Sequence, residues 1–157
     1  MLPDSCTIPS LKHPQDYQAY RISPDDSNRL AIVFDPIRDR VSFTCCIEIY
    51  DPYGKTPPNR HQYAVEMFFI LQGKGQAFCD GKVVEFRTGD TLLVPATGEH
   101  IIENTTAERL YVMCIMVPNE DFAELIRSGQ PVELDAEDFR VLQRVSQHWS
   151  QRQPAPD

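Results

Sequence analysis

Histidine and acidic side chains in two short blocks of the sequence are the residues best suited to chemistry. The first block, residues 56–73, reads TPPNRHQYAVEMFFILQG and places His61 and Glu66 at the start of a run of large apolar residues. The second block, residues 89–104, reads GDTLLVPATGEHIIEN and contains His100. Imidazole and carboxylate groups act as acids and bases or bind divalent metals. A carboxylate that enters an apolar interior is costly unless another group pairs with it, so Glu66 needs a partner.

The spacing within each block constrains which side chains can meet. Side chains alternate between the two faces of a strand, so Asn59 and His61 share a face. Glu66 lies at an odd offset from His61, which would put it on the opposite face of an unbroken strand. We therefore expect a hairpin or bulge around residues 62–65 that brings His61 and Glu66 to one point. In the second block, Pro95 and Gly98 predict a turn that delivers His100 onto a new strand.

Short apolar runs separated by turn residues must position these side chains. The runs are RLAIVFDP, VSFTCCIEIYDPYG, EMFFILQGKG, QAFCDGKVVEF and RLYVMCIMVP. Asp80-Gly81 inside the fourth run is a two-residue hairpin signal. Runs of this length, repeated at intervals of roughly ten residues, indicate an all-β antiparallel sandwich or barrel rather than βαβ units.

The last part of the chain changes from strand to helix periodicity. Phe122, Leu125 and Ile126 follow helical spacing, and Asp135 is placed to cap a second helix. Along that second helix, one apolar stripe is expected, formed by Phe139, Leu142, Val145 and Trp149. We therefore predict an irregular N-terminal arm over 1–16, a barrel over 17–118, and a C-terminal helical tail over 119–157 that packs on the barrel.

The composition narrows the classes of partner and location. The 157 residues and 18.0 kDa favour one domain, and the net charge of -8 argues against nucleic acid or an anionic membrane as a partner. The chain has no apolar run long enough to span a bilayer and no signal-peptide pattern at its start, so we expect a cytoplasmic protein. The five cysteines include no CxxC pair, and those in apolar runs are expected to be buried thiols.

The first block resembles the first sequence motif of the cupins, a family of small jelly-roll β-barrels. Its matching positions are Gly54, Asn59, His61, Glu66 and Gly73. The first gap is one residue shorter than is usual in the family. Asn59 stands where the family has its first histidine.

The second block resembles the second cupin motif through Gly89, Pro95, His100 and Asn104. Fifteen residues separate the two blocks, a short distance that is similar to compact single-domain cupins of microbial type. Thr97 replaces a family glycine, and we expect Gly98, one position later, to supply the positive-φ turn residue instead. The resemblance implies a cupin fold, an antiparallel double-stranded β-helix, over roughly residues 43–118.

The resemblance also implies a metal site. Its ligands would be His61, Glu66 and His100, with the amide of Asn59 as a fourth ligand or facing the same cavity. Two imidazoles and one carboxylate suit a divalent Fe, Mn, Ni, Co or Zn ion with open positions, and the ion would compensate the charge of Glu66. Tyr63 is the candidate general acid.

Two functions from different classes follow. The first is a small metalloenzyme of dioxygenase, isomerase or lyase type that acts on a small organic molecule in the barrel. The second is a non-catalytic barrel that binds a small ligand with or without metal. In a metal-free barrel, Glu66 would pair with Arg60 or Lys55. The resemblance further implies a homodimer in which the first strands or the C-terminal helices cover the partner.

Overall fold

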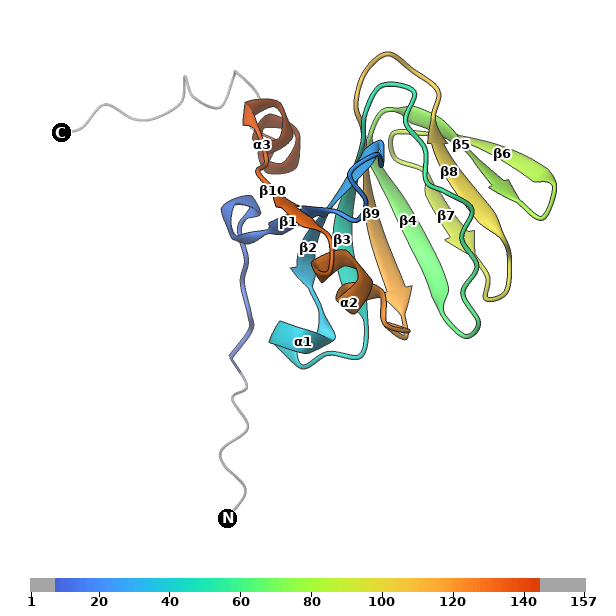
Figure 1. Ribbon diagram of the computed structural model, residues 1–157. Helices are drawn as coiled ribbons and strands as arrows, with labels where there is room; N and C mark the ends of the chain where they lie inside the picture. The colour runs from blue at the N-terminus through green and yellow to red at the C-terminus, as the bar shows by residue number, and fades with distance from the viewer. Residues whose placement is uncertain (1–7, 145–157) are drawn as a thin grey trace.

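The computed structural model describes residues 8–144, which form ten strands and a few short helices (Figure 1). The strands are β1 (Gln18–Arg21), β2 (Asn28–Phe34), β3 (Thr44–Tyr50), β4 (Val65–Gln72), β5 (Lys74–Cys79), β6 (Lys82–Arg87), β7 (Thr91–Val94), β8 (His100–Asn104), β9 (Leu110–Val117) and β10 (Gln130–Val132). The helical segments are the 3-10 turn η1 (Pro14–Asp16) and the α-helices α1 (Pro36–Asp39), α2 (Phe122–Arg127) and α3 (Ala136–Gln143). Val145 and Trp149 of the predicted stripe lie outside the described residues.

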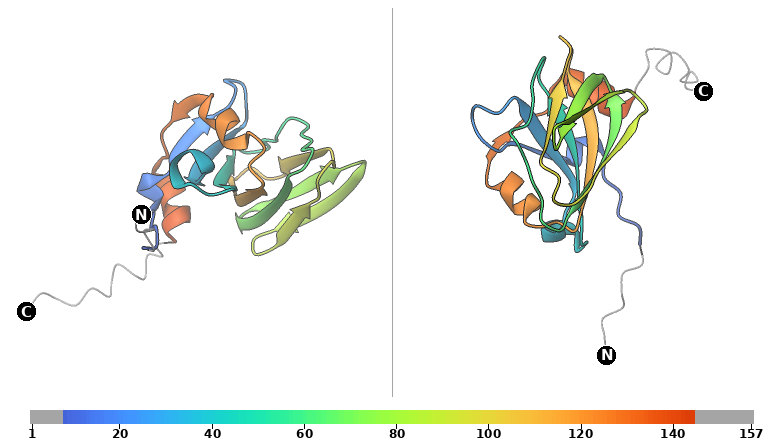
Figure 2. Two further views of the ribbon diagram at one scale, coloured as in Figure 1. Left: turned by 90° about the horizontal axis from the view of Figure 1, so that it is seen from below. Right: turned by 90° about the vertical axis from the view of Figure 1, so that its right-hand side faces the viewer.

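The strands form two antiparallel sheets. The large sheet has the order β10-β1-β2-β3-β9-β4-β7 and the small sheet the order β6-β5-β8. In Figures 1 and 2, the small sheet lies next to β4 and β7, while the helices lie at the opposite side with β1 and β2. This mostly β architecture confirms the predicted jelly-roll fold.

Strand burial explains how an all-β chain of this size builds two cores. All seven residues of β3 are buried, because its inner face contacts the barrel interior and its outer face contacts a second apolar cluster. Strand β4 alternates instead: Glu66, Phe68 and Ile70 point inward, whereas Met67 and Phe69 are exposed. Two interior strands of one sheet therefore differ in the number of covered faces.

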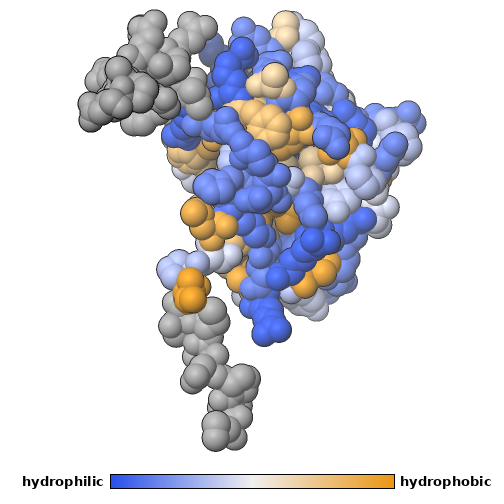
Figure 3. All heavy atoms as spheres, turned by 90° about the vertical axis from the view of Figure 1, so that its left-hand side faces the viewer, coloured by the Kyte–Doolittle hydropathy of each residue, from blue (hydrophilic) through white to orange (hydrophobic). Residues whose placement is uncertain are grey.

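The chain's own ends cover the outer face of β2 and β3. Leu134, Val141 and Leu142 pack against the outer cluster, and Arg29 of β2 donates two hydrogen bonds to Asp138 of α3, at 2.7 and 3.0 Å. Asp135 caps α3 as predicted, because its carboxylate accepts the backbone N–H of Asp138. Figure 3 shows mainly hydrophilic residues on the resulting surface.

Helix α2 lies at the end of the barrel next to β1 and β2. Its buried residues are Phe122, Ala123 and Ile126, while Leu125 of the predicted stripe is 50% exposed. Arg127 donates to the buried carboxylate of Asp35 and to Gln18, which fixes the helix against the large sheet. Among residues 8–144, no helix is long and apolar enough to span a membrane.

Candidate metal centre

His61 and Glu66 come from a loop and the strand that follows it. The chain bends at Gln62 and Tyr63, and β4 begins at Val65, so His61 precedes the strand and the odd offset to Glu66 does not separate the two side chains. The carbonyl oxygen of His61 accepts the backbone N–H of Thr97 at 2.7 Å. This bond ties the first block to the turn of the second.

His100 opens β8 directly after that turn. Thr97 itself has a φ of 70°, and Gly98 has no positive φ, so the expectation that Gly98 supplies the left-handed residue was wrong. A Cβ at residue 98 would lie 3.0 Å from the Sγ atom of Cys79, so a larger residue there would require that side chain to shift. The carbonyl of Gly98 also accepts from Nδ1 of His100 at 2.9 Å.

The three predicted donors converge inside the barrel. Oε2 of Glu66 lies 2.7 Å from Nε2 of His100 and 3.2 Å from Nε2 of His61. The two imidazole centroids are 5.5 Å apart. Glu66 and His100 are each 3% exposed, so the group is nearly sealed from bulk water.

The electrostatics of this group suit a cation. Nδ1 of His100 donates to Gly98, so a neutral His100 presents a lone pair and not a proton to Glu66. Within the described part of the chain, Oε2 of Glu66 is the buried side-chain atom left without a hydrogen-bond partner. Burial alone would raise the pKa of Glu66, but the two imidazoles, when protonated, donate to its carboxylate, outweigh burial and lower its pKa to about 2. Burial would lower the pKa of His100, and Glu66 raises it.

This donor set fits a divalent transition metal. The ligand atoms of His61, Glu66 and His100 all lie within 4.8 Å of one another. Two neutral imidazoles and a carboxylate leave coordination positions open on a first-row ion. A cation among them would satisfy the unpartnered Oε2 atom, which is the observation that supports the fit.

The structure places Asn59 beside this group and Tyr63 away from it. Asn59 lines the same cavity, its backbone pairs with that of His100, and its Nδ2 atom donates to the carbonyl of Pro57 at 3.1 Å. The side chain of Tyr63 is 68% exposed and is absent from the cavity lining. Tyr63 is thus no barrel-lining residue and does not reach the group as a general acid. Arg60 pairs with Glu99, at 3.7 Å, and not with Glu66.

A small cavity opens beside the three donors and has a volume of about 150 Å³. An apolar cavity of about this volume holds benzene in another protein, which sets the scale of a ligand. Its lining combines the donors with apolar and polar residues from both sheets and from α2: Leu30, Glu48, Tyr50, Asn28, Thr56, Phe68, Ile102, Phe122 and Leu125.

Sequence reasoning missed Glu48, a second buried carboxyl group in this cavity. It accepts a hydrogen bond from the hydroxyl of Tyr50 and is 4% exposed. Burial, as the largest effect, raises its pKa to about 7, and the negative charge of Glu66 adds to the increase. The sequence did contain a signal for Glu48, because it is the one charged residue within the apolar run CCIEIY. Glu48 also lies near two buried thiols, Cys46 and Cys114.

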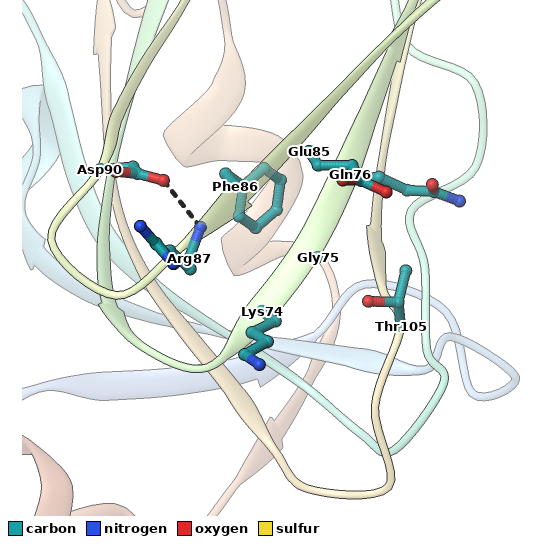
Figure 4. Close-up of a pocket in the computed structure, with 8 residues that line it drawn as sticks. All are labelled: Lys74, Gly75, Gln76, Glu85, Phe86, Arg87, Asp90 and Thr105. Atoms are coloured by element: carbon teal, nitrogen blue, oxygen red, sulfur yellow. Dashed lines mark hydrogen bonds between the residues drawn. The ribbon is translucent and has the colours of Figure 1, made fainter.

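A larger hollow of about 450 Å³ lies elsewhere, on the β5–β6 hairpin (Figure 4). Exposed charged side chains, among them Lys74, Glu85 and Arg87, line much of it. None of the three converging donors borders this hollow, so its size does not make it the site of metal chemistry.

Comparison with known proteins agrees with a small jelly-roll barrel. An RmlC-like cupin from Shewanella frigidimarina superposes with a TM-score of 0.61 at 14% identity, over 73% of this chain and 96% of that one. A predicted oxalate decarboxylase from Thermotoga maritima gives 0.63 at 19% identity, over 69% and 99%.

Sequence comparison finds similarity over the central part of the chain. Residues 46–116 match the family model for the cupin domain. An uncharacterised protein of Methanocaldococcus jannaschii is 34% identical over 68 residues, 43% of this chain. The chain spans about half of that relative, 54% of its length. Residues 46–116 thus match a cupin domain, and the solved structures share its jelly-roll fold.

Proposed function

We propose that this cupin binds a divalent first-row transition metal through His61, Glu66 and His100 and acts as a small metalloenzyme. The observation that carries the proposal is the unpartnered Oε2 atom of Glu66, which faces both Nε2 atoms inside the barrel. Asn59 stays a proposed fourth ligand. The substrate would be a small organic molecule in the adjacent cavity.

A bound divalent ion would polarise a carbonyl group or activate water or dioxygen, which is the chemistry of dioxygenases, isomerases and lyases. The chain's own residues would do the rest. Phe68, Ile102 and Phe122 exclude water from the cavity, and Glu48 exchanges a proton near neutral pH because burial raises its pKa to about 7.

A non-catalytic ligand-binding barrel is the second candidate. The position of Tyr63 favours this candidate. Its phenol, which the sequence indicated as the proton donor, is exposed instead of facing the site. The two candidates differ in turnover. Oxygen uptake or product formation by the metal-loaded protein with small acids, thiols or sugars would support the enzyme, whereas binding without turnover would support the binding module.

Elemental analysis of protein purified without a histidine tag tests the metal proposal. We expect about one first-row metal ion per chain, lost in the His61→Ala/His100→Ala double variant. His13→Ala is the matched control, because His13 is exposed outside the barrel site and should retain the ion. Untagged wild-type protein that stays metal-free after incubation with Fe²⁺, Mn²⁺, Ni²⁺, Co²⁺ or Zn²⁺ contradicts the proposal.

We also propose self-association as a homodimer. The outer faces of β4, β7 and β9 support it, because Met67, Phe69, Leu93 and Val117 are 40%, 37%, 64% and 48% exposed. The first strands and α3 already cover the outer cluster of the same chain. Light scattering after size exclusion should give a dimer that Phe69→Lys dissociates. A monomer at micromolar concentration would exclude this arrangement.

A cytoplasmic location remains a proposal. Its support is chemical, since Cys45, Cys46, Cys79 and Cys114 are free thiols, as expected for a reducing compartment. Thiol counting on freshly isolated, denatured protein should find these cysteines reduced.

A further inference from the structure

Glu120 lies just beyond the cupin-domain match and contacts the loop that carries His61. Its Oε1 atom accepts the backbone N–H of Tyr63 at 2.6 Å, and its Oε2 atom accepts that of Gln62 at 3.0 Å. Oε2 also lies 3.7 Å from Nδ1 of His61. One carboxylate thus holds both the bend and the ring of a candidate metal ligand.

We propose that Glu120 is a positioning residue for His61, completing a carboxylate–histidine–metal arrangement from a segment outside the family match. The inference rests on the proposed metal site. Its basis is the direction of the two ring nitrogens: Nε2 faces Glu66 at 3.2 Å, while Nδ1 faces Glu120.

A carboxylate beside Nδ1 fixes the tautomer of the imidazole. The proton stays on Nδ1, so the lone pair of Nε2 points into the barrel. The carbonyl of Gly98 does the same for His100, at 2.9 Å from Nδ1. Both histidines therefore present Nε2 lone pairs to one point. The contact of His61 with Glu120, at 3.7 Å, is longer than a hydrogen bond and acts through charge.

The backbone around Glu120 supports a role beyond packing. Glu120 and Asp121 have φ values of 46° and 62°, two successive left-handed residues that are not glycine. Such conformations persist where surrounding contacts hold them, and they cluster at functional sites. Phe122 follows directly and places its ring 6.4 Å from that of His61. Residues 120–122 therefore contact the His61 loop and form part of one wall of the cavity.

The test is Zn²⁺ affinity, measured by competition with a chromogenic chelator at fixed pH. We expect Glu120→Ala to bind Zn²⁺ about 10- to 100-fold more weakly, the usual effect of losing such a partner. Glu120→Gln keeps one acceptor oxygen for the two N–H groups and removes the negative charge, so its affinity should lie in between. Glu124→Ala is the matched control: Glu124 is an exposed acid nearby that accepts from Asn119, at 2.7 Å, and it should bind within twofold of wild type.

A second readout separates this inference from the metal proposal. Nitrogen-15 NMR of the metal-free protein should show His61 protonated at Nδ1 in wild type and in Glu124→Ala, and a mixed tautomer in Glu120→Ala. An unchanged tautomer, or Zn²⁺ affinity within twofold of wild type in Glu120→Ala, overturns the role of Glu120. A wild-type protein with the Nδ1 tautomer but no metal affinity overturns the proposed function alone. If Glu120→Ala is misfolded by circular dichroism, Glu120→Gln decides: tautomer and affinity equal to wild type overturn the inference.

Discussion

Thr97→Gly tests whether the turn before His100 holds backbone strain. Thr97 has a φ of 70°, in a region that β-branched residues avoid. A left-handed conformation costs a non-glycine residue about 1–2 kcal/mol. Glycine avoids that cost but loses more chain entropy on folding, roughly 0.5–1 kcal/mol. The difference predicts that Thr97→Gly raises the free energy of unfolding by up to about 1.5 kcal/mol, which corresponds to an increase in Tm of up to roughly 6 °C.

Urea unfolding of the metal-free proteins is the assay, with Thr105→Gly as the matched control. Thr105 is exposed in a loop and does not have a positive φ, so its replacement should cost roughly 0.5–1 kcal/mol. The bond from the N–H of residue 97 to the carbonyl of His61 remains possible in the glycine variant, so Zn²⁺ affinity should not change. If Thr97→Gly destabilises the protein as much as the control does, the strain argument is wrong.

Three further predictions concern other parts of the fold. Asp138→Ala should lower the free energy of unfolding by about 3–5 kcal/mol, because it leaves the buried Arg29 without its partner. Burial would raise the pKa of Asp138, but Arg29 and other donors lower that pKa below 3.8. The carboxylate therefore stabilises the fold fully above that pH, and this stabilisation is lost as the pH falls further. Acid unfolding of the Asp138→Asn variant should lack this loss of stability. Gly75→Ala should destabilise by about 1–3 kcal/mol in urea, since its Cβ would lie 2.3 Å from the carbonyl oxygen of Glu103. Tyr63→Phe should leave Zn²⁺ affinity unchanged in the chelator assay, because the phenol is exposed. A clear loss of Zn²⁺ affinity would mean that Tyr63 does contribute to the site.

Local patterns were enough to predict an all-β antiparallel architecture, whereas the resemblance to the cupin motifs predicted that His61, Glu66 and His100 meet. Strand alternation and turn residues act over a few positions, so they can be found in the sequence. The Asp80-Gly81 turn is one example, since both residues have the positive φ, 46° and 79°, of the predicted two-residue hairpin. The odd offset between His61 and Glu66 predicted a hairpin or bulge around residues 62–65, and the structure has instead a bend at residues 62–63 in the loop before β4.

Long-range contacts account for what the sequence did not reveal. Glu120 is far from His61 in the chain and meets it only because the segment after β9 folds back across the barrel end. Glu48 is one charge in an apolar strand, and its burial depends on the packing of the barrel around β3. The exposure of Tyr63 follows from the same bend that places His61, because the bend turns the next side chains outward.

A crystal structure of Zn²⁺-loaded protein, with anomalous data collected on both sides of the zinc absorption edge, tests the metal site most directly. We predict one anomalous peak per chain, about 2.0–2.2 Å from Nε2 of His61, Nε2 of His100 and a carboxylate oxygen of Glu66. A loaded crystal whose zinc peaks lie only elsewhere, with Glu66 still in contact with both imidazoles, would contradict the metal site.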